Sequence, residues 1–406
     1  MQLDFKYGRQ HVALTAADNN VVPLANPDIN ENLTDPEQAI RDVLETPLDF
    51  PTLRRALTPD DRIVVVVDES IPQLARFLTP VLQHILSAHV KPEAITLLCP
   101  DPSTSQPWLD DLPDDFLDVR VEVHDAGDRD KLSYLATTQK GRRIYMNRTL
   151  VDADQVVVFT RRGHDPLRGY TGGETDLFPA LCDDETRKAL CKPKRSVKVG
   201  KEKKHYEEAG EVAWMIGLPF FVQVISGQDD GLAHVVGGTL ESSAEGLRLW
   251  QERWQVQVSE LADVVIASLG EVADADSFAE MARALMNAAN VVQPDGKIVL
   301  LTDANPDIRE VLPYFQEFEE VGEMLERLAQ ADIAERESLY LWANAAARAN
   351  LYLLSHLSEE TTEDLWATAL QKPEQVQKLV TEDRTCLFLP EANKMYAGLM
   401  GDKVRG

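Results

Sequence analysis

Short strand-like stretches, most of them strongly apolar, recur through the first part of the chain, with helical patterns between them. They lie at 62–67, 94–99, 120–124, 144–148, 156–159 and 220–226. Apolar runs of this length are typical of strands that are buried on both faces. Because strands and helices alternate, the pattern favours an α/β fold with largely parallel sheets.

Three further patterns predict local structure around this series. Residues 1–14 alternate between apolar and polar side chains, which indicates an edge strand or a hairpin arm. Asp35, followed by a proline, predicts the capped start of a helix. Trp250 and Trp254 lie four residues apart on a helix expected at about 244–261, so they share a face and should pack in the core or between domains.

A second series of elements begins near residue 260. We expect strands, helices and one turn at 264–269, 277–289, 294–296, 297–301, 308–349, 351–354, 374–380 and 385–389. The first strand, helix and second strand of this series form a βαβ unit. At 406 residues the chain is long for one domain. We therefore predict two α/β domains with mostly parallel sheets, residues 1–258 and residues 259–406.

The stretch from Gln155 to Leu181 has the layout of a ligand site. An apolar strand is followed by a predicted polar loop and then by Gly172 and Gly173. The polar residues of this loop are Arg161, Arg162, His164, Asp165 and Arg168. Ligands of α/β folds bind at the carboxyl ends of parallel strands, and paired glycines let backbone N–H groups approach a phosphate or carboxylate. An ordinary glycine turn is the alternative interpretation.

The composition is that of a globular protein, and its charge limits the classes of partner that the protein can bind. Hydrophobic residues make up 44% and charged residues 27% of the chain, and the formal net charge is −27. A charge this negative argues against nucleic acid and anionic membranes as general partners. No stretch approaches the roughly 20 apolar residues of a membrane span, and the first residues lack the apolar core of a signal peptide.

Cysteine and glycine spacing excludes several common sites. The four cysteines form no CxxC pair, which fits a reducing cytoplasm and argues against a disulfide framework. Cysteine and histidine spacing does not match a zinc or iron site, and neither a Walker-type loop nor a GxGxxG fingerprint is present. We expect a cytoplasmic protein, and the sequence leaves a homo-oligomer open.

A cluster of basic residues interrupts this acidic chain. The segment 188–204 holds lysines and an arginine that a solvated loop would explain. A site for an anionic ligand or an acidic neighbouring subunit is the alternative.

Four blocks of sequence, in this order and spacing, resemble the nickel-dependent lactate racemase family. They read VVVVDESIP, YLATTQKGRRIYMNRTLVDADQVVVF, GYTGGETDLFPAL and ADVVIASLGEVADADSFAEMARALMNAANVVQPDGKIVLL, within a similarity that spans about 60 to 390. The resemblance implies two α/β domains with the active site in the cleft between them. It also implies a nickel-pincer nucleotide, a pyridinium mononucleotide derivative tethered through a lysine. Members racemise or epimerise 2-hydroxy acids by moving a hydride to and from this cofactor, with histidines as acid and base.

Some positions of the family pattern are kept and others are replaced. Asp68 matches the aspartate of an Asp-x-Thr-Arg-Pro block, in which Ile71 takes the place of the arginine. In the glycine block, Asp165 takes the place of a catalytic histidine, and a shift of one residue would bring His164 there. Thr175 stands where the family has its tethering lysine. The family's other catalytic histidine has no counterpart after the strand at 94–99.

The resemblance assigns roles to the remaining site positions. Cys191 falls where the family has a nickel-ligating histidine, and thiolate is a good nickel ligand. Glu280 and Arg283 fall on a Gln-x-x-Lys pair that contacts substrate, and Arg283 could hold a carboxylate. The resemblance thus implies His164 and Arg283 as catalytic residues and Cys191 as the metal ligand. The implied cofactor-binding residues are Asp68, Asp165, Gly172, Gly173 and Thr175.

Three functions follow from this pattern. The first is a divergent racemase or epimerase of 2-hydroxy acids, with His164 as acid and base. The second is a non-catalytic relative that lacks the tether and the metal and binds an anionic small molecule or a protein partner in the same cleft. The third is a different enzyme in the same cleft, with a carboxylate as acid or base: Asp68, Glu69, Asp165 or Glu174.

Overall fold

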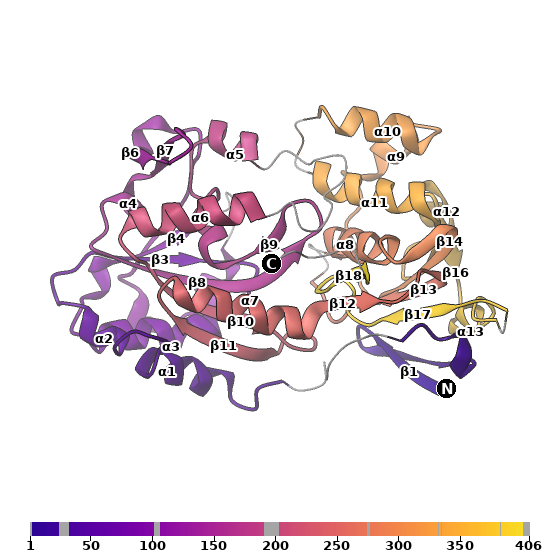
Figure 1. The fold of residues 1–406 in the computed structure, drawn as a ribbon, viewed down its shortest axis with the longest axis horizontal. Coiled ribbons are helices and arrows are strands. Elements are labelled where there is room, and N and C mark those ends of the chain that lie inside the picture. The colour runs from indigo at the N-terminus through magenta and orange to yellow at the C-terminus, as the bar shows by residue number, and fades with distance from the viewer. Residues whose placement is uncertain are drawn as a thin grey trace.

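Two mostly parallel sheets with helices packed on them form the body of the protein (Figure 1). The computed structural model describes residues 2–23, 32–100, 106–190, 203–273, 277–331, 333, 335–381 and 383–400, with the backbone alone for 203–207. Within these ranges the predicted fold class, α/β with mostly parallel sheets, is confirmed.

The first sheet belongs to the N-terminal half. Its strands run in the order β11 (Leu232–Gly238), β10 (Phe220–Ser226), β8 (Gln155–Asp165), β3 (Ile63–Val67), β4 (Ile95–Cys99) and β5 (Arg120–Val123). The strands from β10 to β5 are parallel, and β11 is antiparallel at the edge. The short strand β9 (Gly169–Thr171) folds back on the end of β8.

The central strand β3 shows why its sequence is a continuous apolar run. Its odd-numbered residues pack with α1 (Pro36–Glu45) and α3 (Leu74–Leu86) in one core. Its even-numbered residues pack with α6 (Lys203–Ile216) in another. Both faces are therefore buried, as parallel sheets require. The predicted cap of α1 is also confirmed, because the Asp35 side chain accepts a hydrogen bond from Gln38 N at 2.9 Å.

The second sheet belongs to the C-terminal half. Its strands, all parallel, run in the order β16 (Ala367–Leu370), β15 (Asn350–Leu354), β14 (Val292–Leu301), β13 (Ala262–Ser268) and β17 (Cys386–Leu389). Helices α8 (Ser277–Ala289) and α11 (Arg336–Arg348) pack on one face with Trp250, Trp254 and Trp342. The expected burial of Trp250 and Trp254 is therefore confirmed.

The N-terminal hairpin packs on the C-terminal sheet, although the predicted boundary places residues 1–258 together. Strands β1 (Gln2–Tyr7) and β2 (Gln10–Thr15) pair antiparallel. Their apolar side chains, with α13 (Pro373–Gln377), cover the face of the second sheet that α8 and α11 leave open. Figure 1 shows this indigo hairpin beside β17. The apolar face of the hairpin buries a sheet face that would otherwise be exposed. Local sequence patterns do not reveal this long-range contact.

Two other predicted elements differ from the structure. The strand β7 (Arg143–Asn147) pairs antiparallel with β6 (Leu132–Thr137) in a separate hairpin and does not join the parallel sheet. The helix α7 ends at Trp254 (Glu241–Trp254), because β12 (Gln255–Val258) pairs with β18 (Tyr396–Leu399). The expected helical stretch 308–349 consists of α9 (Leu312–Glu317), α10 (Val321–Leu328) and α11.

Short helices and 3₁₀ turns complete the fold. The helices are α2 (Leu53–Ala56), α4 (Arg148–Val151), α5 (Asp184–Leu190) and α12 (Glu359–Asp364). The 3₁₀ turns are η1 (Asp18–Asn20), η2 (Pro92–Ala94), η3 (Pro107–Asp111), η4 (Asp114–Phe116), η5 (Arg129–Lys131) and η6 (Gly173–Asp176). None of the helices in the described residues combines the length and apolarity needed to cross a membrane.

Candidate functional site

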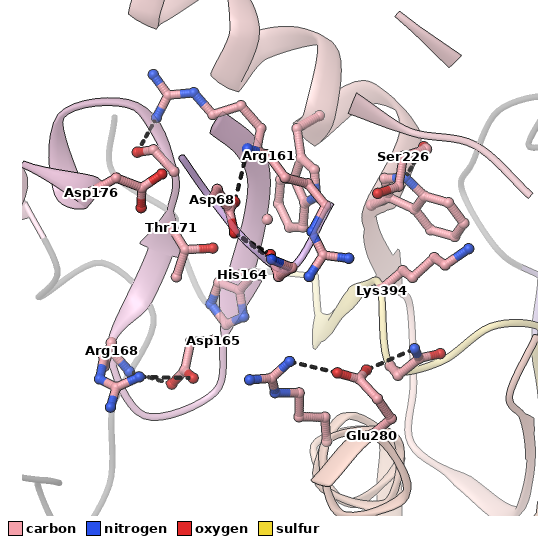
Figure 2. A pocket seen from close by; sticks show the side chains of 18 residues that line it. Asp68, Arg161, His164, Asp165, Arg168, Thr171, Asp176, Ser226, Glu280 and Lys394 are labelled. Atoms are coloured by element: carbon pink, nitrogen blue, oxygen red, sulfur yellow. Dashed lines mark hydrogen bonds and ion pairs between the residues drawn. The ribbon is translucent and has the colours of Figure 1, made fainter. Parts of the chain in front are cut away.

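A pocket of about 200 Å³ lies where residues of the two halves of the chain meet (Figure 2). We call it the interdomain pocket. The N-terminal half lines it with residues that include Asp68, Arg161, His164, Asp165 and Asp176. The C-terminal half lines it with Glu280, Arg283, Asn393 and Lys394. The pocket is thus rich in charged groups from both sides.

The structure brings most of the predicted site residues together. Asp68, His164, Asp165, Gly172 and Arg283 all line the interdomain pocket. These residues come from the end of β3, from β8, from the turn after β9 and from α8.

Three predicted site residues lie elsewhere. Gly173 and Thr175 belong to the turn η6 and are not part of the pocket wall. Cys191, the predicted metal ligand, lies outside the residues that the structure describes, as does most of the basic segment 188–204.

The polar residues 161–165 form the end of a strand, and the prediction of a loop there is wrong. Arg161 and Arg162 pair with Val224 and Ile225 of the parallel strand β10. Residues 163–165 then pair with β9, so the chain turns back as a hairpin. Neighbouring strands satisfy the backbone of this segment, which overrides its polar composition. The consequence is a rigid support for His164 and Asp165.

Asp68 links the ends of β3 and β8 through three donors. Its Oδ1 accepts hydrogen bonds from the backbone N–H of Ser70, at 2.9 Å, and from the Ser70 hydroxyl. Its Oδ2 accepts from the backbone N–H of Arg161 at 2.9 Å. Both oxygens of Asp68 are therefore held by the fold at the pocket wall.

Asp176 is a second carboxyl group in the same wall. It receives a hydrogen bond from the Thr160 hydroxyl, and the same hydroxyl accepts one from Gly173 N–H at 2.8 Å. Burial, and next the negative charge of Asp68, raise the pKa of Asp176 to about 8. The Thr160 hydrogen bond and the positive charge of Arg162 only partly oppose this rise. The wall thus contains, beside Asp68, a carboxyl group that holds its proton near neutral pH.

His164 lies among aromatic rings from both halves of the chain. Its ring centroid is 4.8 Å from that of Tyr396, 5.7 Å from Tyr170 and 6.1 Å from Trp250, on which it stacks. Aromatic contacts of this kind restrict the orientation of the imidazole. His164 is therefore held in place at the pocket, as an acid–base or hydrogen-bonding group must be.

The neighbouring Asp165 is buried and ionised. Its Oδ1 accepts hydrogen bonds from the backbone N–H groups of Leu167, at 2.8 Å, and Arg168, at 2.9 Å. Burial works to raise the pKa of Asp165, but Arg168, Arg283 and the two backbone donors outweigh it and hold the pKa below its ordinary value. The side chain is thus engaged by the fold, and the positive charge of Arg283 acts on it across the pocket.

The C-terminal wall is built around Glu280 on α8. Arg283 Nη1 donates to Glu280 Oε1 at 2.7 Å, and Asn393 Nδ2 donates to Glu280 Oε2 at 2.8 Å. Asn393 is 8% exposed, and its Oδ1 has no hydrogen-bond partner among the described residues. A buried amide oxygen without a donor costs free energy, so it indicates where a ligand donor would bind.

Lys394 joins the two halves of the chain beside the pocket. Its Nζ donates to the backbone oxygens of Gly227, at 3.1 Å, and Asp229, and it pairs with Glu391. Gly227 and Asp229 follow β10 of the first sheet, whereas Lys394 precedes β18. This contact holds the C-terminal wall against the N-terminal one.

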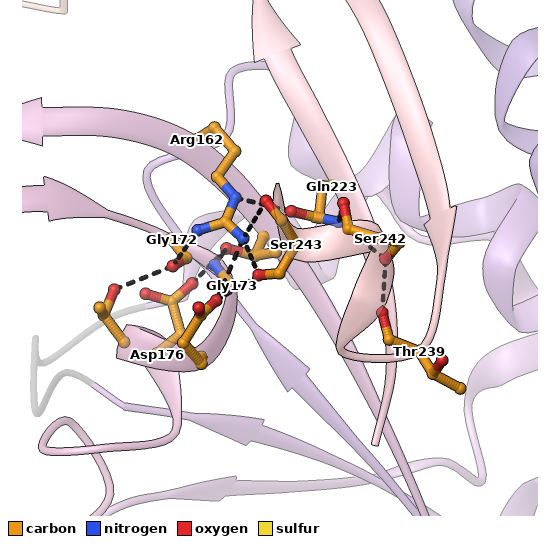
Figure 3. A network of polar contacts seen from close by, with 11 residues as sticks. Arg162, Gly172, Gly173, Asp176, Gln223, Thr239, Ser242 and Ser243 are labelled. Atoms are coloured by element: carbon orange, nitrogen blue, oxygen red, sulfur yellow. Dashed lines mark hydrogen bonds and ion pairs between the residues drawn. The ribbon is translucent and has the colours of Figure 1, made fainter. Parts of the chain in front are cut away.

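A buried ion-pair network stands behind the pocket (Figure 3). Arg162 is 1% exposed and Glu174 is 2% exposed, and they pair at 3.1 Å. The Arg162 guanidinium also donates to Gln223 Oε1 at 2.6 Å, to the Gly172 carbonyl at 2.8 Å and to Ser243. We call these five residues the Arg162 network. Because every partner is itself buried or bonded, the network fixes the turn after β9.

The two glycines serve this network. A Cβ on Gly172 would lie 2.2 Å from the Arg161 carbonyl oxygen, and a Cβ on Gly173 would lie 2.3 Å from Arg162 Nη2. Both residues also have positive φ, +84° and +63°. The close approach that requires glycine is thus made by the protein's own groups. The Gly173 N–H is bonded to the Thr160 hydroxyl and is not presented to a ligand.

The described residues do not fit a lysine-tethered nickel-pincer nucleotide. Thr175 has no amine, and its hydroxyl donates to the Gly172 carbonyl at 3.0 Å. Ile71, in the place of the family's arginine, is 3% exposed and packs in the core. Among the described residues, no three His, Cys, Asp or Glu side chains are grouped so that they could hold a metal ion.

Sequence reasoning missed three pocket residues. Asp176 lies three residues after Gly173, so the glycine block itself pointed to it, but its proton depends on Asp68 and Thr160. Asn393 and Lys394 come from a short segment, EANK, with no pattern that separates it from an ordinary turn. Only the fold brings them to the carboxyl end of β8.

Comparison with known proteins agrees with this architecture. Residues 7–190 match the family model described as the lactate racemase N-terminal domain. Among solved structures, the lactate racemase apoprotein from Thermoanaerobacterium thermosaccharolyticum is similar, with a TM-score of 0.78 and 14% identity over 98% of this chain and 100% of that one. A protein from Thermotoga maritima gives a TM-score of 0.63 and 13% identity over 89% of this chain and 98% of that one. No curated protein sequence matches the chain.

These findings confirm the resemblance predicted from the sequence. The family match covers most of the first half of the chain, and the fold match covers nearly all of it. Residues 7–190 thus match the lactate racemase N-terminal domain, and the chain as a whole shares its fold with the lactate racemase apoprotein.

Proposed function

We propose that this protein binds a small hydroxycarboxylate, of the 2-hydroxy acid class, in the interdomain pocket, and does so without a lysine-tethered nickel-pincer nucleotide. One observation carries the proposal. Arg161 of β8 and Arg283 of α8 line the same pocket, and the Arg161 guanidinium makes no hydrogen bond or ion pair with the described residues. A guanidinium group in a pocket, with its N–H donors not used by the protein, is suited to bind a ligand carboxylate.

The remaining wall fits the other end of such a ligand. Asn393 Oδ1 is a buried acceptor that a ligand hydroxyl would satisfy. The pocket volume of about 200 Å³ suits a molecule of a few carbon atoms. Pockets for drug-sized ligands are larger, roughly 300–1,000 Å³. A short acid with a hydroxyl group therefore matches the size and the polar groups of the site.

Racemisation or epimerisation of the same acids is the second candidate. It rests on His164, which stands at the pocket on a rigid strand end, and on the match to the lactate racemase N-terminal domain. In this function His164 would accept and return the proton of the ligand hydroxyl, and Arg161 and Arg283 would orient the carboxylate. The hydride that leaves C2 and returns to it would need an acceptor that binds in the pocket without the lysine tether.

Calorimetric titration of the purified protein with L-lactate and D-lactate tests the proposal. We expect binding of at least one enantiomer without added nickel, and little binding of propionate, which lacks the hydroxyl. Arg161→Gln and Arg283→Gln should each weaken binding about 10- to 100-fold, since a hydrogen bond to a charged group contributes roughly 1.5–3 kcal/mol. Arg309→Gln, an exposed arginine paired only with Asp307 among the described residues, is the matched control.

Two outcomes would decide against the proposal. If neither enantiomer binds, or if Arg161→Gln and Arg309→Gln bind lactate equally well, the pocket is not a hydroxycarboxylate site. Chiral analysis of lactate after incubation with the protein separates the two candidates. Interconversion that His164→Gln abolishes would support the racemase, and unchanged enantiomers together with tight binding would support a binding function alone.

A further inference from the structure

Two carboxyl groups in one pocket wall raise the question of which one carries a proton. Asp68 and Asp176 both line the interdomain pocket, and neither is paired with a lysine or arginine side chain among the described residues. Figure 2 shows both on the wall formed by the first sheet. Two neighbouring carboxylates in a partly buried site disfavour double ionisation, so one of them retains a proton.

The hydrogen bonds decide where that proton resides. Asp68 accepts from three donors, two of them backbone N–H groups, and both of its oxygens are engaged. Asp176 accepts from one, the Thr160 hydroxyl. That hydroxyl already accepts from Gly173 N–H, and Asp176 Oδ2 is the acceptor for its single proton. Oδ2 of Asp176 is therefore an acceptor, and Oδ1 is left to carry the proton.

The charged groups around Asp176 are consistent with this placement. The positive charge of Arg162 favours loss of the proton from Asp176. The Arg162 guanidinium is, however, already bonded to Glu174, Gln223, Gly172 and Ser243. Helix α6, which also packs on η6, brings Glu208 and Glu211. Glu208 pairs with Arg142 and Lys140, and Glu211 accepts from Gln139 N–H.

We propose that Asp176 is a hydrogen-bond donor of the interdomain pocket: it holds the proton of the Asp68–Asp176 pair and presents it to an oxygen of the bound hydroxycarboxylate. The identity of the ligand in this inference rests on the proposed function. The position of the proton does not depend on it. The pocket then offers cations for the carboxylate, a protonated acid for an acceptor oxygen, and Asn393 Oδ1 for a hydroxyl proton. The ligand class it selects has all three groups close together.

Infrared difference spectroscopy tests the position of the proton without any ligand. We expect wild-type protein at pH 6 to show the C=O stretch of a protonated carboxylic acid that is absent from Asp176→Asn and unchanged in Asp307→Asn, an exposed control. The band should disappear as the pH rises through about 8. A spectrum in which Asp176→Asn removes no such band overturns the inference, whatever the protein binds.

Titration with lactate across pH tests the donor role. Affinity in the wild type should be constant at neutral pH and fall by about tenfold per pH unit well above 8, because binding then requires the uptake of one proton. Asp176→Asn keeps a donor in its amide, so its affinity should stay within a few-fold of the wild type and lose the alkaline decline. Asp176→Ala should bind about tenfold more weakly at pH 7.

The outcomes separate this inference from the proposed function. Lactate binding whose alkaline decline persists in Asp176→Asn would overturn the donor role and leave the proposed function standing. A complete lack of lactate binding would overturn the proposed function and the donor role together, while the infrared band still decides where the proton resides.

Discussion

Arg161 and Arg162 are neighbours on β8, and the structure uses them in opposite ways. Arg162 is 1% exposed, and its guanidinium is bonded to Gln223, Gly172, Glu174 and Ser243. The guanidinium of Arg161 lines the interdomain pocket with no such partner among the described residues. The comparison shows that a charged residue in a strand does not by itself indicate a ligand site. The partners that the fold provides distinguish a structural ion from a binding one.

The largest effect should come from opening the Arg162 network. Glu174→Gln leaves the buried Arg162 charge uncompensated, so we expect the free energy of unfolding to fall by about 3–5 kcal/mol. Arg161→Gln should change it by less than about 0.5 kcal/mol, because its guanidinium has no described partner to lose. Urea denaturation of both variants measures the difference. Equal losses of stability would mean that the two arginines are not used differently.

Substitution of Gly173, which contacts Arg162 of this network, should reduce stability by a smaller amount, and Gly141 provides a control. Gly173→Ala combines positive φ with a Cβ 2.3 Å from Arg162 Nη2, whereas Gly141→Ala has positive φ with open space around it. Backbone strain of this kind costs roughly 1–3 kcal/mol, and only Gly173→Ala should add the displacement of Arg162. Thermal unfolding should therefore rank Gly173→Ala as clearly the less stable variant. The reverse order would remove the structural role assigned to Gly173.

A third prediction concerns pH and the pocket side of the comparison. The folded-state pKa of Asp176, about 8, lies above its unfolded value, so the group's contribution to stability is complete below pH 4. It is lost as the pH rises toward 8, because only the unfolded chain is ionised in that window. The melting temperature of Asp176→Asn, relative to that of the wild type, should therefore rise between pH 5 and pH 8. Each kcal/mol of stability corresponds to about 2–4 °C for domains of 150–250 residues. A difference that stays constant from pH 5 to 8 would show that Asp176 is ionised throughout.

Much of the fold could be predicted from local sequence, for identifiable reasons. The apolar run of β3 and the capped start of α1 are dictated by residues within a few positions of each other. The helix expected at 277–289 has the bounds of α8 because its apolar residues repeat along one face. Residues 1–14 were predicted to form an edge strand or a hairpin arm, and they form the hairpin β1–β2. The place of this hairpin on the second sheet depends on a face almost 250 residues away in the chain.

Only part of the site could be predicted, because some of its properties arise from contacts between distant segments. Asp68, His164 and Asp165 lie at strand ends, where α/β folds place ligands, so the sequence could identify them. The glycines could be found but not interpreted, because their close neighbours are the Arg161 carbonyl and the Arg162 side chain and not a ligand. The proton on Asp176 and the open acceptor of Asn393 arise from contacts between distant segments.

One experiment tests the central claim most directly. The protein would be coexpressed with enzymes that make the nickel-pincer nucleotide, and the same sample analysed for intact mass, nickel content and lactate binding. We predict an unmodified mass, nickel well below one atom per chain, and lactate binding that Arg161→Gln weakens about 10- to 100-fold. A covalent adduct with stoichiometric nickel, and lactate binding only in the loaded protein, would contradict the account.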